Sequence, residues 1–162
     1  LLLKEGKTEE EILEILKQKS RDNARTPMQW SAEDNAGFTS GTPWINPASN
    51  YKEINVEKEL NSTDTIFSYY QALISLRKKY DIITYGDYHL VLADDPQVFA
   101  YTRNWNEEQL VVVSNFYGNE VELELPVTLK NNSEILISNY HDSKTNNKLT
   151  LRPYESIVYY AK

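Results

Sequence analysis

The sequence of 162 residues contains no cysteine, which excludes disulfide bonds, thiol catalysis and cysteine-ligated metal sites. The two histidines, His89 and His141, stand far apart and match no metal-ligand spacing. We therefore expect neither a metal ion nor a cofactor. A chain without cysteine fits a reducing compartment, and we expect a cytoplasmic location.

Basic residues, long apolar runs and familiar catalytic motifs are also scarce. Lysine and arginine number 17 against 24 aspartates and glutamates, so the net charge of −7 repels phosphate backbones and argues against nucleic acid as a partner. The apolar run Leu1–Leu3 is too short for a signal or membrane segment, and we expect no membrane partner. The patterns GxGxxG, GxSxG and HExxH and a phosphate-binding loop are absent.

The beginning of the chain is unusual for a gene product. Residue 1 is leucine, and the only methionine is Met28. Because translation begins with methionine, we expect the chain to be a piece of a longer protein. On this interpretation Leu1–Leu3 is the end of an element that begins upstream.

Two stretches have the apolar periodicity of helices. Thr8 and Glu11 have the spacing of a capping box and precede an apolar stripe, which predicts a helix of about three turns after Thr8. A second helix is predicted from residue 63 or 64 to Tyr80, with cations in its last turn. Its broad apolar face requires a large partner surface. That face comprises Ile66, Phe67, Tyr69, Tyr70, Leu73, Ile74, Leu76 and Tyr80.

Residues 31–61 have little periodicity and are rich in glycine, proline, asparagine and tryptophan. The aromatic content argues against disorder. We expect a long loop that carries a small core of its own, with one helical turn at Val56–Leu60.

After Tyr80 the period changes from 3.6 to 2, which indicates strands. Leu110–Val113 is apolar on both faces, so this strand should be central in its sheet. Short strands separated by turn signals are typical of an antiparallel sandwich. The predicted strands are 88–92, 98–103, 109–116, 120–125, 134–138, 149–151 and 156–160.

The change of period coincides with a change of charge. Residues 1–80 carry 11 basic and 12 acidic side chains, a net charge of −1, whereas residues 81–162 carry 6 and 12, a net charge of −6. We therefore expect an α+β fold with a boundary near residue 81, in which N-terminal helices and a long loop precede an antiparallel β-sandwich.

The stretch Ser20–Trp30 holds the densest set of directional hydrogen-bonding groups. In one interpretation, Arg21, Asp22 and Arg25 form an internal salt bridge that holds the loop. In the other they line a binding site, since the arginine fork suits carboxylates and sugar hydroxyls. Carboxylates are plentiful, so counting alone leaves a glycosidase pair open, although most of them fit solvated surfaces. The tryptophans can stack on sugars, but their spacing specifies no sugar platform: Trp30, Trp44 and Trp105.

The run Ser20–Trp30, SRDNARTPMQW, resembles a signature of the oligo-1,6-glucosidase branch of glycoside hydrolase family 13, the α-amylase family. The likeness extends from about residue 8 to the end of the chain. It includes Asn35–Phe38, Pro43–Trp44, Asn50–Val56, Leu73–Lys78, Tyr85–Gly86 and Leu151–Glu155.

The resemblance implies a TIM barrel followed by a C-terminal antiparallel β-domain. Residues 1–80 would be the end of the catalytic barrel, with its last loop and last helix, and residues 81–162 the β-domain. A barrel needs about 250 residues, so this chain cannot build one. The family's catalytic carboxylates lie on barrel strands before this segment, so we expect no catalytic residue in the chain.

The resemblance also implies a role for Arg21. This residue matches the family's glucose-site arginine, which pairs with an aspartate from an early barrel loop and closes the bottom of an exo-acting pocket. Arg21 is therefore the expected substrate-binding residue, and Arg25 is assigned to the structure of the loop.

These observations predict the C-terminal part of a retaining α-glucosidase, acting on terminal α-glucosidic bonds of short oligosaccharides and inactive as an isolated chain. The alternative is a non-catalytic β-sandwich module that braces the barrel or binds carbohydrate. Bracing is favoured, because no exposed aromatic platform can be argued from the sequence. Without a barrel, the apolar face of the second helix should be covered by self-association or by residues 1–60 folding back. Isomaltose, maltose, trehalose 6-phosphate and sucrose are not distinguished.

Overall fold

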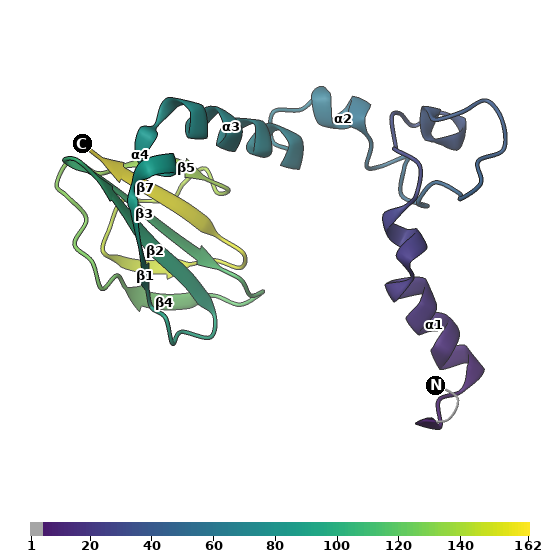
Figure 1. Ribbon diagram of the computed structural model, residues 1–162, viewed down its shortest axis with the longest axis horizontal. Coiled ribbons are helices and arrows are strands. Elements are labelled where there is room, and N and C mark those ends of the chain that lie inside the picture. Colours follow the sequence, from purple (N-terminus) through teal and green to yellow (C-terminus); the bar gives the residue numbers. More distant parts are fainter. Residues whose placement is uncertain (1–4) are drawn as a thin grey trace. The chain divides into compact units, whose positions relative to one another are not determined.

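The computed structural model describes residues 5–162, so the element expected to end at Leu1–Leu3 lies outside the described residues. The chain divides into two compact units, one ending at Ser68 and the other spanning Tyr69–Lys162. Figure 1 shows the helices and strands of both, and each unit is described here by itself. Within residues 5–162, no helix is long and apolar enough to cross a membrane.

Helix α1 (Glu9–Lys19) opens the first unit and confirms the predicted capping box. The Thr8 hydroxyl accepts from the Glu11 N–H at 3.2 Å, and the Thr8 N–H donates to the Glu11 carboxylate at 2.8 Å. Acidic residues occupy its first turn and lysines its last, which suits the helix dipole.

The long loop is organised by hydrogen bonds, and the expected small core is almost absent. Among the described residues up to Ser68, only Ala36 and Asn55 are buried, while Trp30, Phe38 and Trp44 are exposed. The backbone supplies the order instead. The predicted helical turn is α2 (Val56–Leu60), which the buried Asn55 side chain caps by accepting from the Lys58 N–H. The carbonyls of Gln29 and Trp30 accept from the first two amides of this helix at 2.9 and 3.0 Å.

Helix α3 (Ile66–Lys79) begins two or three residues later than the sequence predicts. The cause is a reciprocal cap: the Ser68 N–H donates to the Thr65 hydroxyl at 3.1 Å, and the Thr65 N–H donates to the Ser68 hydroxyl at 3.0 Å. Arg77–Lys79 occupy its last turn as predicted, and none of its residues is buried. A short helix that the sequence analysis missed, α4 (Asp81–Tyr85), follows at once.

All seven predicted strands are present and antiparallel, so the predicted α+β architecture is confirmed. Five form one sheet in the order β1-β2-β3-β7-β5, and two form a second sheet, β4-β6. Strand β3 is central, as its apolar sequence predicts. The strands are β1 (Asp87–Val91), β2 (Val98–Trp105), β3 (Glu108–Asn115), β4 (Val121–Glu124), β5 (Glu134–Ser138), β6 (Lys148–Leu151) and β7 (Ser156–Ala161).

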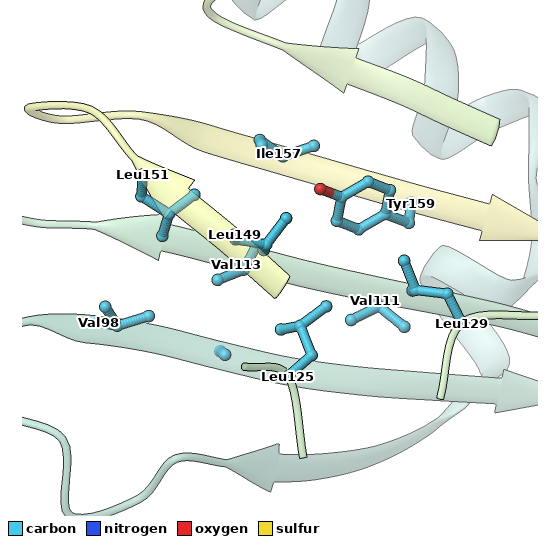
Figure 2. Packing of buried hydrophobic residues seen from close by; sticks show 10 residues of the cluster. Val98, Val111, Val113, Leu125, Leu129, Leu149, Leu151, Ile157 and Tyr159 are labelled. Atoms are coloured by element: carbon cyan, nitrogen blue, oxygen red, sulfur yellow. The ribbon is translucent and has the colours of Figure 1, made fainter. Parts of the chain in front are cut away.

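The main core lies on one face of the five-stranded sheet. Figure 2 shows Leu149 and Leu151 of β6 packed against side chains of β2, β3 and β7. Tyr159 is the largest fully buried side chain, and its hydroxyl donates to the Lys144 carbonyl at 3.0 Å. Burial raises the pKa of Tyr159 to about 12, with a further increase from the charge of Glu155. The two sheets therefore form the predicted sandwich.

The opposite face of the five-stranded sheet has a second, smaller core. Ile82 of α4 is fully buried there against Leu110, Val112 and Tyr160. The Tyr80 and Tyr160 rings meet edge to face at 4.8 Å between their centroids. The short helix α4 thus seals part of the face that the two-stranded sheet does not reach.

Candidate functional site

Arg21 opens the 3₁₀ helix η2 (Arg21–Ala24), directly after α1. The Ser20 hydroxyl accepts from the Asp22 N–H at 3.3 Å and so begins this turn. The side chain of Arg21 is exposed, and within residues 5–162 its guanidinium takes part in no hydrogen bond or ion pair. The backbone of Arg21, the candidate substrate-binding residue, is therefore held in a turn, while its guanidinium is exposed to solvent.

Arg25 is placed differently, and it confirms its assignment to the structure of the loop. Its guanidinium forms an ion pair with Asp22 at 3.1 Å. It also lies 5.0 Å from the ring centroid of Trp44, within the range of a cation–π contact. The salt bridge considered in the sequence analysis therefore exists between Asp22 and Arg25, and Arg21 is not part of it.

A second loop, residues 30–41, is fixed by three successive residues in the left-handed region. The φ angles of Asn35, Ala36 and Gly37 are 52°, 58° and 65°. This conformation is costly for alanine, yet Ala36 is fully buried and its carbonyl accepts from the N–H groups of Trp30 and Ser31. The Asn35 amide donates to the carbonyls of Thr39 and Gly41 at 3.2 and 3.0 Å. Sequence periodicity carries no signal for this arrangement.

These two loops border an open cleft of about 300 Å³. Trp44 stands at it with 85% of its surface exposed, one ring face near Arg25. So large an apolar exposure marks a surface that another group can cover. The cleft is lined by Arg25, Thr26, Pro27, Met28, Phe38, Pro43, Trp44 and Ile45.

The β-domain contains a buried carboxylate that the sequence analysis did not single out. Glu155 is 2% exposed and accepts from the Arg152 guanidinium at 2.8 and 3.0 Å and from the Ser143 hydroxyl at 2.6 Å. The Arg152 guanidinium also pairs with Asp142 at 2.6 Å and lies 3.8 Å from the ring centroid of Tyr140. The only advance signal was the place of both residues in the run Leu151–Glu155.

Hydrogen bonds hold the pKa values of these carboxyl groups low. Burial alone would raise the pKa of Glu155, but hydrogen bonds from Arg152 and Ser143 hold it below its usual range. The hydrogen bond from Arg152 likewise lowers the pKa of Asp142. A glycosidase's general acid needs a raised pKa, so neither group is suited to that role.

The free part of the five-stranded sheet carries a row of aromatic side chains that could not be argued from the sequence. Ring centroids of Tyr88 and Tyr101 are 5.2 Å apart, those of Tyr101 and Phe99 5.7 Å, and those of Phe99 and Phe116 6.2 Å. Sequence reasoning missed the row because its members come from β1, β2 and the segment after β3, and only strand pairing aligns them.

Within residues 5–162, no three histidine, aspartate or glutamate side chains come close enough together to hold a metal ion.

Two family models match the chain. Residues 2–86 match the catalytic domain of α-amylase, and residues 98–158 match the C-terminal domain of the α-amylase SusG. The chain therefore belongs to the α-amylase family, glycoside hydrolase family 13. The order of the two matches agrees with the observed order of helices and antiparallel sheets.

Individual relatives of the chain carry the names of a hydrolase and a glucosidase. The chain is 48% identical over 157 residues to the trehalose-6-phosphate hydrolase of Bacillus subtilis and 47% identical over 157 residues to the oligo-1,6-glucosidase of Parageobacillus thermoglucosidasius. Each match covers 95% of this chain and 28% of the relative. The crystal structure of Bacillus licheniformis trehalose-6-phosphate hydrolase is 53% identical, with a TM-score of 0.92 over 98% of this chain and 29% of that one.

The chain thus spans less than a third of the length of these relatives. The names of these relatives point to two kinds of substrate, trehalose 6-phosphate and α-1,6-linked oligosaccharides. The chain is almost equally identical to both relatives, at 48% and 47%. The resemblance of the Ser20–Trp30 loop to that of a glucosidase is confirmed at the level of the family, and the role of Arg21 stays a prediction.

Proposed function

We propose that this chain is the C-terminal part of a retaining α-glucosidase that removes terminal α-glucosyl units from short oligosaccharides. Residues 1–80 would complete a catalytic barrel and residues 81–162 would form its β-domain. The family membership and the relatives named above support this proposal. The absence of cysteine supports a cytoplasmic site of action.

Arg21 is the residue that we expect to bind the substrate. Of the two arginines in the loop, Arg25 is engaged by Asp22 and Trp44, whereas Arg21 pairs with no described residue. An exposed guanidinium on a backbone fixed at both ends is suited to a carboxylate supplied from elsewhere and to the hydroxyls of a sugar. Arg21 would therefore close the bottom of the glucose pocket, with an aspartate from the barrel.

The 162-residue chain should not hydrolyse glucosides by itself. A retaining glycosidase needs two carboxyl groups about 5 Å apart, one of them an acid with a raised pKa. The two described carboxyl groups with a shifted pKa, Asp142 and Glu155, are shifted downward and tied to Arg152. Measurable turnover of an aryl α-glucoside by the purified chain, with contaminants excluded, would contradict this proposal.

A joined protein tests both the parent activity and Arg21. In the Bacillus licheniformis trehalose-6-phosphate hydrolase, the segment matched by this chain is replaced with these 162 residues, and hydrolysis of trehalose 6-phosphate, isomaltose and maltose is measured. We expect turnover of at least one substrate. Arg21→Lys should lower kcat/KM about 100-fold, because a bidentate charged contact of about 3 kcal/mol is lost.

Arg25→Lys is the matched control, since it changes the same residue type in the same loop. We expect it to lower kcat/KM no more than about fivefold, because Arg25 is assigned to loop structure and its ion pair is exposed. Equal losses in both variants, with both proteins folded by circular dichroism, would remove the special role of Arg21.

A non-catalytic module is the second candidate function, and the exposed aromatic row is the observation that favours it. Successive rings in the row are tilted by 38°, 54° and 82°, so they form an uneven surface rather than a flat platform for sugar rings. Bracing of the barrel is therefore preferred to carbohydrate binding. Titration calorimetry with maltose and isomaltose separates the two: saturable binding at millimolar concentration or tighter would favour carbohydrate binding.

A further inference from the structure

Trp44 is a large side chain that its own unit leaves almost uncovered. Its surface is 85% exposed, against 50% for Trp30 and 37% for Trp105. The Arg25 guanidinium lies over one face of the ring, 5.0 Å from its centroid. Within residues 5–162 the ring meets no other aromatic ring. The second face of Trp44 is therefore open to a ligand.

The guanidinium behind Trp44 is itself fixed. Arg25 forms an ion pair with Asp22 at 3.1 Å, and the Arg25 N–H donates to the Asp22 carbonyl at 3.0 Å. Arg25 is the only charged side chain among the residues that line the cleft beside Trp44. Because its charge is paired, the cleft favours an uncharged ring over a phosphate or a carboxylate.

The cleft has the size and the mixed polarity of a site for one small ring. Its volume of about 300 Å³ is at the lower end of the range for ligand pockets, which combine apolar walls with a few polar groups. Here the walls include Phe38 and Pro43, and the Thr26 hydroxyl also lines the cleft. This hydroxyl forms no hydrogen bond within the part of the chain that the structure describes. A pyranose ring matches both features, since it has apolar C–H faces and hydroxyl groups at its edge.

The cleft lies close along the chain to the candidate glucose-binding residue. Arg21 opens η2, and Arg25 caps the same short helix. A 3₁₀ helix rises by about 2.0 Å per residue, so the backbones of Arg21 and Arg25 are about 8 Å apart along it. A disaccharide can bridge such a separation. The cleft is therefore within reach of the second unit of a substrate whose first unit is bound by Arg21.

We propose that Trp44 stacks on the second sugar unit of the substrate, the unit that leaves when the terminal glucose is cleaved off. This proposal rests on the proposed function, since it requires that Arg21 bind the terminal glucose. Trp44 then selects the leaving group, while Arg21 selects the glucose. A phosphate on the second unit would lie outside the cleft, which offers it no unpaired cation.

An apolar side chain from elsewhere in a longer protein fits the cleft less well. It would account for the exposure of Trp44. It would also cover the Thr26 hydroxyl without giving it a hydrogen bond, and a buried polar group without a partner is costly. A sugar ring covers Trp44 and supplies that partner.

A substrate without a second sugar tests the proposal. In α-D-glucosyl fluoride the leaving group is fluoride, so nothing enters the cleft. In the joined protein, kcat/KM is measured for this compound and for whichever of trehalose 6-phosphate, isomaltose and maltose is hydrolysed fastest. Trp44→Leu should lower kcat/KM about tenfold for the oligosaccharide, mainly through KM, and less than about twofold for the fluoride. Arg21→Lys should lower both, because both substrates contain the terminal glucose.

Two further variants control for effects on folding. Trp105→Leu removes a partly exposed tryptophan from β2 and should change neither value by more than about twofold. Trp44→Phe keeps a smaller aromatic face and covers the case in which leucine prevents folding. We expect it to lower kcat/KM about threefold for the oligosaccharide and to leave that for the fluoride unchanged.

The remaining outcomes overturn the proposal. Equal losses for both substrates in the Trp44 variants would assign Trp44 to packing within the enzyme. An unchanged kcat/KM for the oligosaccharide would show that its second sugar lies elsewhere. In both cases the joined protein is active and the proposed function stands. A joined protein that hydrolyses none of the substrates, α-D-glucosyl fluoride included, would instead contradict the proposed function, and the role of Trp44 with it.

Discussion

The two units of this chain are held together by different forces. Among the described residues up to Ser68 only Ala36 and Asn55 are buried, and order comes from caps, turns and side-chain amides bonded to the backbone. From Tyr69 onward the chain buries two apolar clusters, one on each face of a five-stranded sheet. Hydrogen bonds add little net stability in water, whereas buried apolar area adds much. The first unit therefore has a defined backbone conformation but too little buried apolar surface to be stable by itself.

This difference teaches where function and stability lie in the chain. The first unit carries the exposed Arg21, the cleft beside Trp44 and the left-handed turn at Ala36. The second unit carries the core and a buried ion pair. A loop that lines a ligand pocket must keep its polar groups accessible, so a neighbouring scaffold has to supply its rigidity.

The largest expected effect is on thermal unfolding when the two units are expressed separately. Residues 69–162 expressed alone should unfold cooperatively on heating, because both apolar clusters lie within them. Residues 5–68 alone should show no cooperative transition, since a helix of 11 residues without a core is not stable in water. Calorimetry of both peptides measures this, and a cooperative transition in residues 5–68 would break the comparison.

The next effect contrasts the same substitution in the two units. Leu151→Ala should destabilise the chain by about 3 kcal/mol, because Leu151 is fully buried in the main core. Leu13→Ala in α1 should change stability by less than about 0.5 kcal/mol, because that side chain is largely exposed. Urea denaturation followed by circular dichroism gives both values. Similar losses would show that α1 packs against more than the structure records.

A smaller effect tests the buried carboxylate. Glu155→Gln should cost about 2 kcal/mol at pH 7, because the acceptor of the hydrogen bonds from Arg152 and Ser143 loses its negative charge. The pKa of Glu155 is lower in the folded state than in the unfolded state, so its contribution is complete above the unfolded pKa and disappears as pH falls through the folded pKa. The stability difference between wild type and variant should therefore shrink below about pH 4. A difference that stays constant between pH 7 and pH 3 would contradict this account.

The smallest effect concerns the loop of the first unit. Asn35→Ala removes two hydrogen bonds and places alanine at a φ of 52°, which should weaken the turn locally by about 1 kcal/mol. Limited proteolysis within residues 35–45 should become about fivefold faster, while the unfolding of the second unit stays unchanged. Ser40→Ala, an exposed change in the same loop, is the control and should have no effect.

The strands were predictable because each alternates over a few residues between turn signals. Their pairing was not, since β7 lies between β3 and β5, and nothing in its sequence indicates which neighbours it joins. The helix α4 was missed because its five residues fall where the period changes. The start of α3 was placed too early, because residues 63 and 64 suit a cap as well as Thr65, and only the bond to Ser68 decides.

The candidate site was predictable in its location and only partly in its geometry. The density of polar groups in Ser20–Trp30 identified the loop. The salt-bridge interpretation is right for Asp22 and Arg25, whereas the binding interpretation of Arg21 stays a prediction. Which arginine takes the aspartate depends on the turn of η2, and spacing alone does not specify it. The left-handed residues at Ala36 and the Arg152–Glu155 pair are both local in sequence, but they lie in turns without apolar periodicity, so the periodic patterns did not indicate them.

The order of the strands along the chain affects how the β-domain folds during synthesis. Strand β3, with its four consecutive apolar residues, pairs on one side with β2, which precedes it, and on the other with β7, which follows only after β4, β5 and β6. Until residues 156–161 emerge from the ribosome, one edge of an aggregation-prone valine-rich segment stays unpaired. A nascent chain that stops near residue 155 should therefore aggregate rather than form a smaller folded domain.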